Sequence, residues 1–434
     1  MNNYENKKKF DFPVGFFPLS FNLAETGRAI LVAKEFKKMG GKPIIFTHGG
    51  QYDYLPREMG FKTIKIKPFF NEKISKEIVS INRKEKKGIP YTEDFLRKAV
   101  KEEVKAFRDT KIKALVSFVN LPSSISTKVL DIIHINICPG SGNFYLSTPD
   151  YFENTFTRFI PQKIKITILN LIFSKTKPKV MKPFNKIAKE YNLKSFRNSY
   201  DLIRGDITLA TNFDEFLDIF PNQKEFPNKN YVGIILLENL FQNIFPMKEK
   251  NEIEKEIDTH ISKKGKSIFL TMGSSGDKDL FTKLLRELNK TKYRVVALRG
   301  NILKESELPN LNENILVKKF VPSTAKIHNN VDLSIIHGGQ GTVYTAVYAA
   351  KPIIGIPMQF EQHLHLEKTV GHGMGLMLSK KFYKKNDLIN AIQKIFDNYD
   401  YYYNNCQKLA KKLPPPNGEK NAAMRITQIL SDIC

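Results

Sequence analysis

Short hydrophobic runs alternate with amphipathic stretches along the first half of the chain. The runs FPVGFFP, KPIIFT, ALVSFVN, HINIC and DITLAT have the length and composition of buried strands. Between the first two, residues 22–41 place Ala29, Ile30, Ala33 and Phe36 on one helical face and end in two glycines. Strands separated by helices predict parallel βαβ units, and therefore an α/β domain.

The alternation stops near residue 220 and resumes near residue 263. The interruption contains FPNQKEFPNKN and the charged stretch MKEKNEIEKEID, which predict an interdomain linker and an opening helix. The strand-like runs KSIFLTMG, YRVVALRG, NILVKKFVP, VDLSIIHGG and KPIIGIP follow, with helical segments between them. We therefore predict two doubly wound, Rossmann-like α/β domains. The predicted boundaries are 1–235 for the N-terminal domain, 236–262 for the linker and opening helix, 263–415 for the C-terminal domain, and 416–434 for a last helix that could pack back on the N-terminal domain.

The composition shows a strong excess of basic residues. The 434 residues include 69 Lys and Arg against 44 Asp and Glu, which gives a formal net charge of +25. Such a surface attracts phosphate-bearing partners such as nucleotides, nucleic acid or anionic lipid. The basic residues are scattered and form no aromatic-interleaved recognition motif, so no nucleic-acid partner is expected.

Cysteine use and hydropathy favour a cytoplasmic protein. Cys138, Cys406 and Cys434 are far apart and match neither a disulfide framework nor a zinc spacing. The polar N-terminus does not resemble a signal peptide, and no apolar run reaches the roughly 18–20 residues that a membrane span needs. The apolar piece Ile164–Phe173 lies in the basic, aromatic segment Thr155–Phe184. This segment leaves open a peripheral position on the inner face of the membrane and a lipid acceptor. Its other interpretation is a packed helical pair with solvated lysines.

Two strand ends in the second half are rich in glycine and hydroxyl groups. FLTMGSSGD and SIIHGGQGT each end a strand and begin a helix. Ligands of open α/β sheets bind at such carboxyl ends, where glycines let backbone N–H groups approach an anion beside the helix dipole. Neither stretch has the pattern of a P-loop or a clean G-x-G-x-x-G. We interpret the two ends as a phosphate-binding site, with the acid–amide pair Glu361–Gln362 further along the chain.

The succession FVPS, HGGQGT, KPIIGIP and EQ resembles the donor-binding signature of family 1 glycosyltransferases, the enzymes that use nucleotide sugars. The likeness is strongest from Phe320 to Gln362, and TMGSS, YVGIIL and the two-domain rhythm extend it over most of the chain. The resemblance implies the GT-B fold, in which two Rossmann-like domains face each other across a cleft. It also implies that no metal or other cofactor is needed, because helix dipole, histidine and hydroxyl groups stabilise the departing diphosphate.

The resemblance also assigns roles to single residues. The histidine, the glycines and Thr342 would hold the donor diphosphate, and the loop of Phe320 and Val321 would take the base. The acid–amide pair would bind hydroxyls of the transferred sugar. The implied donor-binding residues are Ser274, Val321, His337, Gly338, Gly339, Gln340, Gly341, Thr342, Glu361 and Gln362.

One residue departs from the family pattern. Many members carry a glutamate that binds both ribose hydroxyls at the position that Thr345 occupies here. A dTDP-sugar is therefore an alternative to a UDP-sugar as the donor.

The resemblance places the catalytic base just inside the first helix, at Glu25, where the family typically has a histidine. A buried carboxylate can act as a general base when desolvation raises its pKa from about 4.3 toward neutrality. The other interpretation of Glu25 is an inert glutamate stabilised by the helix dipole. His48, after the second strand, is the reserve candidate for the base.

The stretch EQHLHLEKTVGHG offers Glu361, His363, His365 and His372 as metal ligands. On a helix, His363 and His365 point to different faces, so we expect no shared metal.

We therefore expect an inverting, metal-independent glycosyltransferase that moves a hexose-type sugar from a nucleotide diphosphate sugar to an acceptor hydroxyl. The acceptor is a lipid, a glycan or a small molecule. One alternative is a nucleotide-sugar 2-epimerase of the same fold, which would need several acidic residues around one sugar. The other is a basic nucleic-acid-binding protein.

Overall fold

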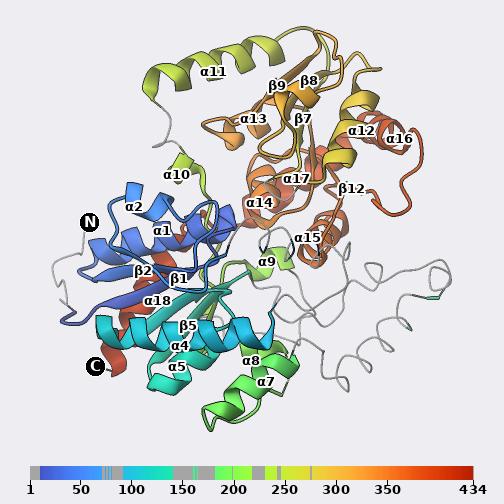
Figure 1. The fold of residues 1–434 in the computed structure, drawn as a ribbon. Coiled ribbons are helices and arrows are strands. Elements are labelled where there is room, and N and C mark those ends of the chain that lie inside the picture. The colour runs from blue at the N-terminus through green and yellow to red at the C-terminus, as the bar shows by residue number, and fades with distance from the viewer. Residues whose placement is uncertain are drawn as a thin grey trace.

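The structure, a computed structural model, describes residues 10–70, 91–139, 181–197, 199–217, 230–241, 246–273 and 276–433, with residues 74, 77, 80, 160, 161 and 164. These residues form two α/β domains, each built on a parallel six-stranded sheet (Figure 1). In Figure 1 the N-terminal sheet, in blue and cyan, lies below the C-terminal sheet, in orange. The prediction of two Rossmann-like α/β domains is confirmed.

The N-terminal sheet has the strand order β3-β2-β1-β4-β5-β6. Its strands are β1 (Val14–Pro18), β2 (Pro43–Thr47), β3 (Thr63–Lys65), β4 (Ala114–Phe118), β5 (Ile133–Cys138) and β6 (Ile207–Ala210). Every residue of β1 and β4 is buried, because helices cover both faces of a parallel sheet. This burial explains why these strands appear in the sequence as continuous hydrophobic runs.

The helices of this half include α1, which begins at an Asn22 side chain that accepts a hydrogen bond from the N–H of Ala24. The helices up to the linker are α1 (Leu23–Lys38), α2 (Leu55–Glu58), α4 (Glu93–Thr110), α5 (Ser123–Leu130), α7 (Met181–Glu190), α8 (Ser199–Ile203) and α9 (Asp214–Leu217). Helices α10 (Glu238–Phe241) and α11 (Met247–Ile261) then lead into the second domain.

The C-terminal sheet repeats the same topology in the order β12-β11-β10-β7-β8-β9. Its strands are β7 (Ser267–Thr271), β8 (Arg294–Leu298), β9 (Ile315–Lys318), β10 (Leu333–Ile336), β11 (Ile353–Gly355) and β12 (Gly375–Met377). Its helices are α12 (Lys278–Leu288), α13 (Thr324–Asn330), α14 (Gln340–Tyr348), α15 (Phe360–Gly371), α16 (Asp387–Asp397) and α17 (Tyr399–Lys412), with the 3-10 helix η4 (Glu305–Glu307).

In each sheet, successive strands are added first toward one edge and then, after one switch point, toward the other edge. In the N-terminal sheet this switch point lies between β1 and β4, and in the C-terminal sheet between β7 and β10. Open α/β sheets bind ligands outside the carboxyl ends of the strands at such points. The loops after β1, β7 and β10 are therefore the places to examine for a site.

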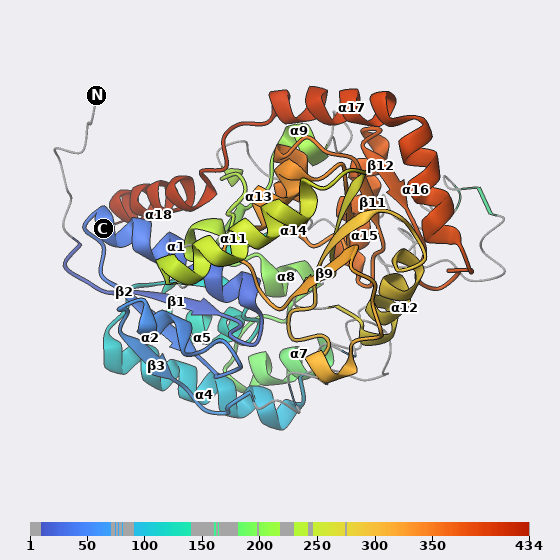
Figure 2. The ribbon, with the colours of Figure 1, turned by 90° about the horizontal axis from the view of Figure 1, so that it is seen from above.

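The last helix, α18 (Gly418–Ile433), returns to the N-terminal domain and packs against α1. Figure 2 shows the red α18 beside the blue α1. Ala422, Ala423, Ile426, Ile429 and Leu430 are buried in the same hydrophobic core as the residues of α1 and β1. The N-terminal core is thus built from both ends of the described chain.

The pattern analysis missed the two short edge strands β3 and β12, each three residues long. In the stretch YVGIIL, Tyr231 forms an isolated bridge with Ala210. Most of the basic, aromatic segment Thr155–Phe184 lies outside the described residues. None of the described helices combines the length and the apolar character needed to cross a membrane.

Candidate functional site

His337 lies at the switch point of the C-terminal sheet, directly after β10. Its ring rests against Gly273, which follows β7: a Cβ atom at Gly273 would come within 2.4 Å of His337 Cε1. A Cβ atom at Gly339 would come within 2.5 Å of His337 Nε2. Glycine at both positions is therefore what lets the imidazole fit between the two loops.

Gly338 places the first turn of α15 beside the same loop. Its φ is +88°, and a Cβ atom there would lie 2.6 Å from the carbonyl oxygen of Gln362. Both the backbone conformation and the close approach require glycine. The loop after β10 thus brings His337 and the Glu361–Gln362 pair into one neighbourhood.

The first turn of α14 presents backbone N–H groups at this loop. The helix begins after Gly339, and no side chain caps its N-terminus. The N–H of Val343 donates to Gly339 O at 2.9 Å, as in the first regular turn of a helix. Gly341 is exposed, with no atom within 4 Å of its Cβ position, and Thr342 is half-buried. An uncapped helix N-terminus beside a histidine favours the binding of an anion. Ser274, on the facing loop, lies outside the described residues.

The predicted base-binding loop precedes α13. Phe320 is 44% exposed, whereas the Val321 side chain is buried in the core beneath α11. Any contact of Val321 with a donor would therefore use its main chain. Glu238 of α10 holds the loop from the other side, since its Oε1 accepts from the N–H of Thr324 and of Ala325, both at 3.0 Å.

Gln340 and Gln362 make contacts that differ from the expected ones. The Gln340 amide donates to Thr211 O at 2.7 Å, and its oxygen accepts from Thr211 Oγ1 at 3.3 Å. The Gln340 side chain therefore joins the two domains, and a contact of its main chain with the donor stays a prediction. Gln362 Oε1 accepts from the N–H of Met358 at 2.9 Å and fixes the turn that precedes α15. Its contact with a sugar stays a prediction.

Tyr344 strengthens the domain contact that Gln340 begins. Its hydroxyl donates to Asn212 Oδ1 and accepts from the N–H of Phe213 at 3.4 Å. The same ring packs on Phe216, with 4.8 Å between the ring centroids. Sequence reasoning missed these residues, because nothing in the loop after β6 marks it as the partner of α14.

Glu25 faces this region from the N-terminal domain. It lies in the first turn of α1 and is 7% exposed, and Arg28 Nη2 lies 3.5 Å from its Oε1. Burial raises the pKa of Glu25 to about 7, Arg28 lowers it, and the charge of Glu361 on α15 raises it further. Burial also raises the pKa of Glu361, against the effect of Arg28. Burial is thus the main cause of the raised pKa at both carboxyl groups, one in each domain.

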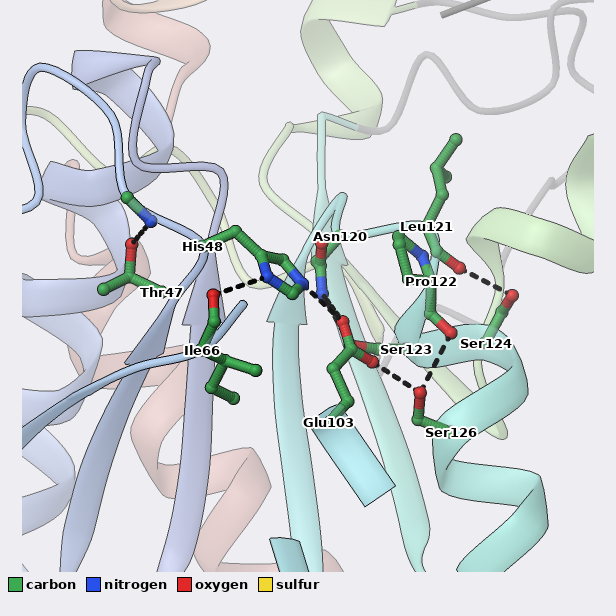
Figure 3. Close-up of polar contacts among 11 residues, drawn as sticks. Thr47, His48, Ile66, Glu103, Asn120, Leu121, Pro122, Ser123, Ser124 and Ser126 are labelled. Atoms are coloured by element: carbon green, nitrogen blue, oxygen red, sulfur yellow. Dashed lines mark hydrogen bonds and ion pairs between the residues drawn. The ribbon is translucent and has the colours of Figure 1, made fainter. Parts of the chain in front are cut away.

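His48 lies elsewhere, inside the N-terminal domain, and its hydrogen bonds do not suit the reserve assignment as base (Figure 3). Its Nδ1 is 3.1 Å from Ile66 O and its Nε2 is 2.9 Å from Glu103 Oε1. Both ring nitrogens are engaged, and the residue is 2% exposed. With both ring nitrogens bonded inside the domain, His48 has no ring nitrogen left to face an acceptor, so we correct this assignment.

Figure 3 shows that Glu103 is the centre of the network around His48. Glu103, on α4, is fully buried and holds together the ends of β2 and β4 and the start of α5. Three further side chains donate to its carboxylate: Asn120, Ser123 and Ser126. A buried carboxylate needs this many donors. The network is structural.

The histidines that the sequence offered as metal ligands have separate surroundings. His372 Nε2 is 3.0 Å from Phe216 O, and the ring stacks on Phe216. Burial lowers the pKa of His365 to about 4. Within the part of the chain that the structure describes, no three His, Cys, Asp or Glu side chains are grouped so that they could hold a metal. Thr345 is buried, and its hydroxyl donates to Gly341 O at 2.8 Å.

Comparison with known proteins finds sequence similarity centred on the second domain. Residues 267–420 match the glycosyltransferase family 28 C-terminal domain. The chain is 25% identical over 230 residues to an uncharacterized UDP-glucosyltransferase, YojK, of Bacillus subtilis (strain 168), covering 52% of this chain and 53% of that protein. It is 23% identical over 236 residues to a 2-hydroxyacylsphingosine 1-beta-galactosyltransferase of Rattus norvegicus, covering 54% of this chain and 41% of that protein. The aligned region thus spans about half, or less, of the length of these curated relatives.

Solved structures share the fold of the whole chain. The calicheamicin glycosyltransferase CalG4 superposes with a TM-score of 0.66 at 12% identity, over 98% of this chain and all of the other. The glycosyltransferase VinC in complex with dTDP superposes with a TM-score of 0.61 at 12% identity, over 97% of this chain and 99% of the other. At this identity the similarity establishes the fold.

Proposed function

We propose that this chain, a GT-B protein of the family 1-like glycosyltransferases, transfers a sugar from a nucleotide diphosphate sugar to an acceptor hydroxyl. One observation carries the proposal: the loop after β10 brings His337, the uncapped N-terminus of α14 and the Glu361–Gln362 pair together, and Glu25 of the other domain is a buried carboxyl group. A transfer reaction needs a base on the acceptor side and a hydroxyl-binding group on the sugar, close to an anion site. These residues supply all three.

In the proposed reaction the donor diphosphate lies at the first turn of α14, next to His337. Glu361 accepts hydrogen bonds from hydroxyls of the sugar. Glu25 removes the proton of the acceptor hydroxyl, and the acceptor oxygen forms a bond to the anomeric carbon on the face opposite the diphosphate. The bond from that carbon to the phosphate oxygen breaks, and its electron pair leaves with the nucleotide. Attack from the opposite face inverts the anomeric centre.

The direct test is incubation of the purified protein with UDP- and dTDP-sugars and mixed acceptors, with detection of released nucleotide and of the product anomer. We expect nucleotide release and an inverted glycoside. The variant Glu25→Gln should lose transfer by about 10²–10⁴-fold, the usual contribution of a general base. Its donor binding should be retained, because Glu25 lies on the acceptor side. Near-normal turnover by this variant would remove Glu25 from the mechanism, and isomerised sugar without transfer would identify a 2-epimerase.

The nucleoside of the donor is the second element of the proposal. Thr345, whose hydroxyl already donates to Gly341 O, replaces the family's ribose-binding glutamate. Together with solved neighbours in complex with dTDP, this supports a dTDP-sugar as the donor. Thermal-shift measurements with dTDP and UDP should show the larger rise with dTDP, and a ligand at 100 times its Kd stabilises by about 2.7 kcal/mol. A rise with UDP alone would overturn this choice.

We also propose that transfer needs no metal, because the α14 N-terminus and His337 can offset charge on the leaving diphosphate. Activity should survive dialysis against a chelator. Activity that is lost on chelation and restored by Mg²⁺ would contradict this.

The proposal for the chemical class of the acceptor is based on the sequence. The basic, aromatic segment Thr155–Phe184 supports a lipid acceptor at an anionic membrane surface. Co-sedimentation with anionic vesicles, compared with neutral vesicles, tests this idea. Equal recovery from both would favour a glycan or small-molecule acceptor.

A further inference from the structure

Gln340, the first residue of α14, is a polar residue in a buried position. It lies in the turn whose backbone N–H groups form the proposed anion site, and it is 3% exposed. Burying a side-chain amide costs free energy unless its donor and its acceptor both have hydrogen-bond partners. The partners of Gln340 therefore indicate what this end of α14 is fixed to.

Both polar ends of the Gln340 side chain are bonded to one residue of the other domain. Its Nε2 donates to Thr211 O at 2.7 Å, and its Oε1 accepts from Thr211 Oγ1 at 3.3 Å. A nitrogen can only donate here and an oxygen can only accept, so the two bonds fix the orientation of the amide. The first turn of α14 is thus bonded directly to the N-terminal domain.

Thr211 is itself held firmly by the N-terminal sheet. It directly follows β6 and is fully buried. Its N–H and its Oγ1 both donate to Cys138 O, at 2.9 Å and 3.2 Å. Cys138 is the last residue of β5 and pairs in register with Ala210 of β6. Thr211 therefore transmits the position of two strands to Gln340.

The same face of α14 makes two further contacts of this kind. Residues four apart lie on one face of a helix, and Tyr344 and Tyr348 follow Gln340 at this spacing. Tyr344 bonds to the two residues that follow Thr211. The Tyr348 hydroxyl donates to Pro414 O at 2.6 Å, in the segment between α17 and α18. Gln340 is the member of this row that lies at the proposed anion site.

The proposed base and the proposed anion site belong to different domains. Glu25 lies in the first turn of α1, and the N–H groups of residues 340–342 lie in the first turn of α14. Catalytic groups have to be held within about 0.5 Å of their productive positions. A displacement of about 1 Å can reduce the rate by about 100-fold. A contact that fixes one of these turns to the opposite domain therefore bears on the rate of transfer.

We propose that Gln340 is a positioning residue that sets the place of the diphosphate-binding turn of α14 relative to the N-terminal domain. The inference rests on the proposed function for the site that this turn forms. The groups that hold the diphosphate, the main chain of the turn and His337, all belong to the C-terminal domain. Binding of the donor therefore does not need the Gln340 side chain. Transfer needs it, because the base lies on the other side of the contact with Thr211.

The test is the kinetics of a variant that loses both hydrogen bonds but keeps the length of the side chain, Gln340→Met. Its kcat and its kcat/KM for the donor should both fall by about 10–100-fold with KM unchanged, the pattern of an interaction that matters only in the transition state. The conservative variant Thr211→Ser keeps the hydroxyl and the carbonyl oxygen and should retain the wild-type rate. The matched control Tyr348→Phe removes a hydrogen bond from the same face of α14, further along the helix, and should also retain it.

The variant Thr211→Val provides the same test if Gln340→Met does not fold. It removes only the bond at 3.3 Å, so kcat should fall by a smaller factor with KM unchanged. An unchanged kcat in Gln340→Met, or a raised KM for the donor alone, would overturn the positioning role. An equal loss of rate in Tyr348→Phe would also overturn it, because the rate would then follow the stability of α14.

A second readout needs no substrate. Amide hydrogen exchange in residues 339–343 reports how firmly the first turn of α14 is held. Exchange there should be faster in Gln340→Met and unchanged in Tyr348→Phe. Unchanged exchange in Gln340→Met would contradict the proposal. If exchange becomes faster but the wild type turns over no nucleotide sugar, the positioning contact stands and the proposed function fails.

Discussion

At the scale of single residues, the main feature is a buried carboxyl group, Glu25, that changes its charge near neutral pH. Glu25 has a pKa of about 7 in the native protein, against an ordinary value of 4.5. Ionisation of Glu25 therefore occurs at lower pH in the unfolded chain than in the native state. Between these two pKa values the native state binds the extra proton, and its stability falls as the pH rises.

Replacing Glu25 by Gln should therefore stabilise the protein at high pH. The difference of about 2.5 units corresponds to about 3 kcal/mol of stability that is present below pH 4.5 and lost as the pH rises through 7. Denaturant unfolding at pH 5 and pH 8 measures the effect. The advantage of the variant over the wild type should be larger at pH 8, and an equal difference at both values would show that Glu25 is ionised throughout.

The hydrogen bond between His48 and Glu103 predicts that replacement of His48 destabilises the protein. Replacing His48 by Leu removes one hydrogen-bond partner from the fully buried Glu103 carboxyl group, at a cost of about 1–3 kcal/mol. Unfolding measurements should show this loss, while the rate per folded molecule changes little. A large loss of rate in a stable variant would return His48 to the list of catalytic residues.

Site residues marked by a local sequence pattern could be predicted, whereas contacts with distant parts of the chain could not. The loop that holds His337 is marked by glycines that the packing needs, so the sequence indicated its place. Glu25 followed from its position in the first helix. The contact of Gln340 with Thr211 was not predicted, because Thr211 lies in the other domain and a sequence pattern does not show where two domains touch. The hydrogen bonds of His48 were not predicted either, because Glu103 lies in the same domain but is distant in sequence.

At the scale of elements, strongly patterned segments were predictable and short edges were not. Strands such as β4 are buried throughout and appear as hydrophobic runs, whereas β3 has three residues, none of them fully buried. Such an edge strand forms because β2 offers unpaired backbone groups, and its own sequence has little pattern. The sequence predicted a last helix, α18, but it did not predict that this helix packs on α1.

The packing of α18 on α1 should contribute strongly to stability. Replacing Ile426 by Ala removes a fully buried side chain from the N-terminal core and should cost about 2–5 kcal/mol. Met424, two positions earlier, is 45% exposed and provides the control, since Met424→Ala should change stability by less than about 0.5 kcal/mol. Similar losses in both variants would argue against this packing.

At the scale of the whole molecule, the two domains are joined by α14 and the loop after β6. The Tyr344 hydroxyl is buried between Asn212 and the N–H of Phe213. This contact lies at the start of the same helix whose N-terminus is the proposed diphosphate site. Domain association and the proposed donor binding would therefore depend on one element.

Replacing Tyr344 by Phe should weaken the domain contact and leave each core intact. The buried oxygen of Asn212 loses its donor, which costs about 1–3 kcal/mol. Calorimetry should show a lower and broader transition as the domains unfold less cooperatively. A transition of unchanged width and midpoint would show that the contact contributes nothing to the coupling.

The return of α18 to α1 also determines the order in which the domains can be completed during synthesis. The N-terminal core contains Ala422, Ile426 and Leu430, which leave the ribosome after the entire second domain. At bacterial and eukaryotic elongation speeds, the interval between α10 and α18 is roughly 10–40 s. During that time the part of the α1 surface that α18 covers has no partner from its own chain. The second domain, although synthesised later, can finish folding first, and the nascent N-terminal domain is the part that would need a chaperone.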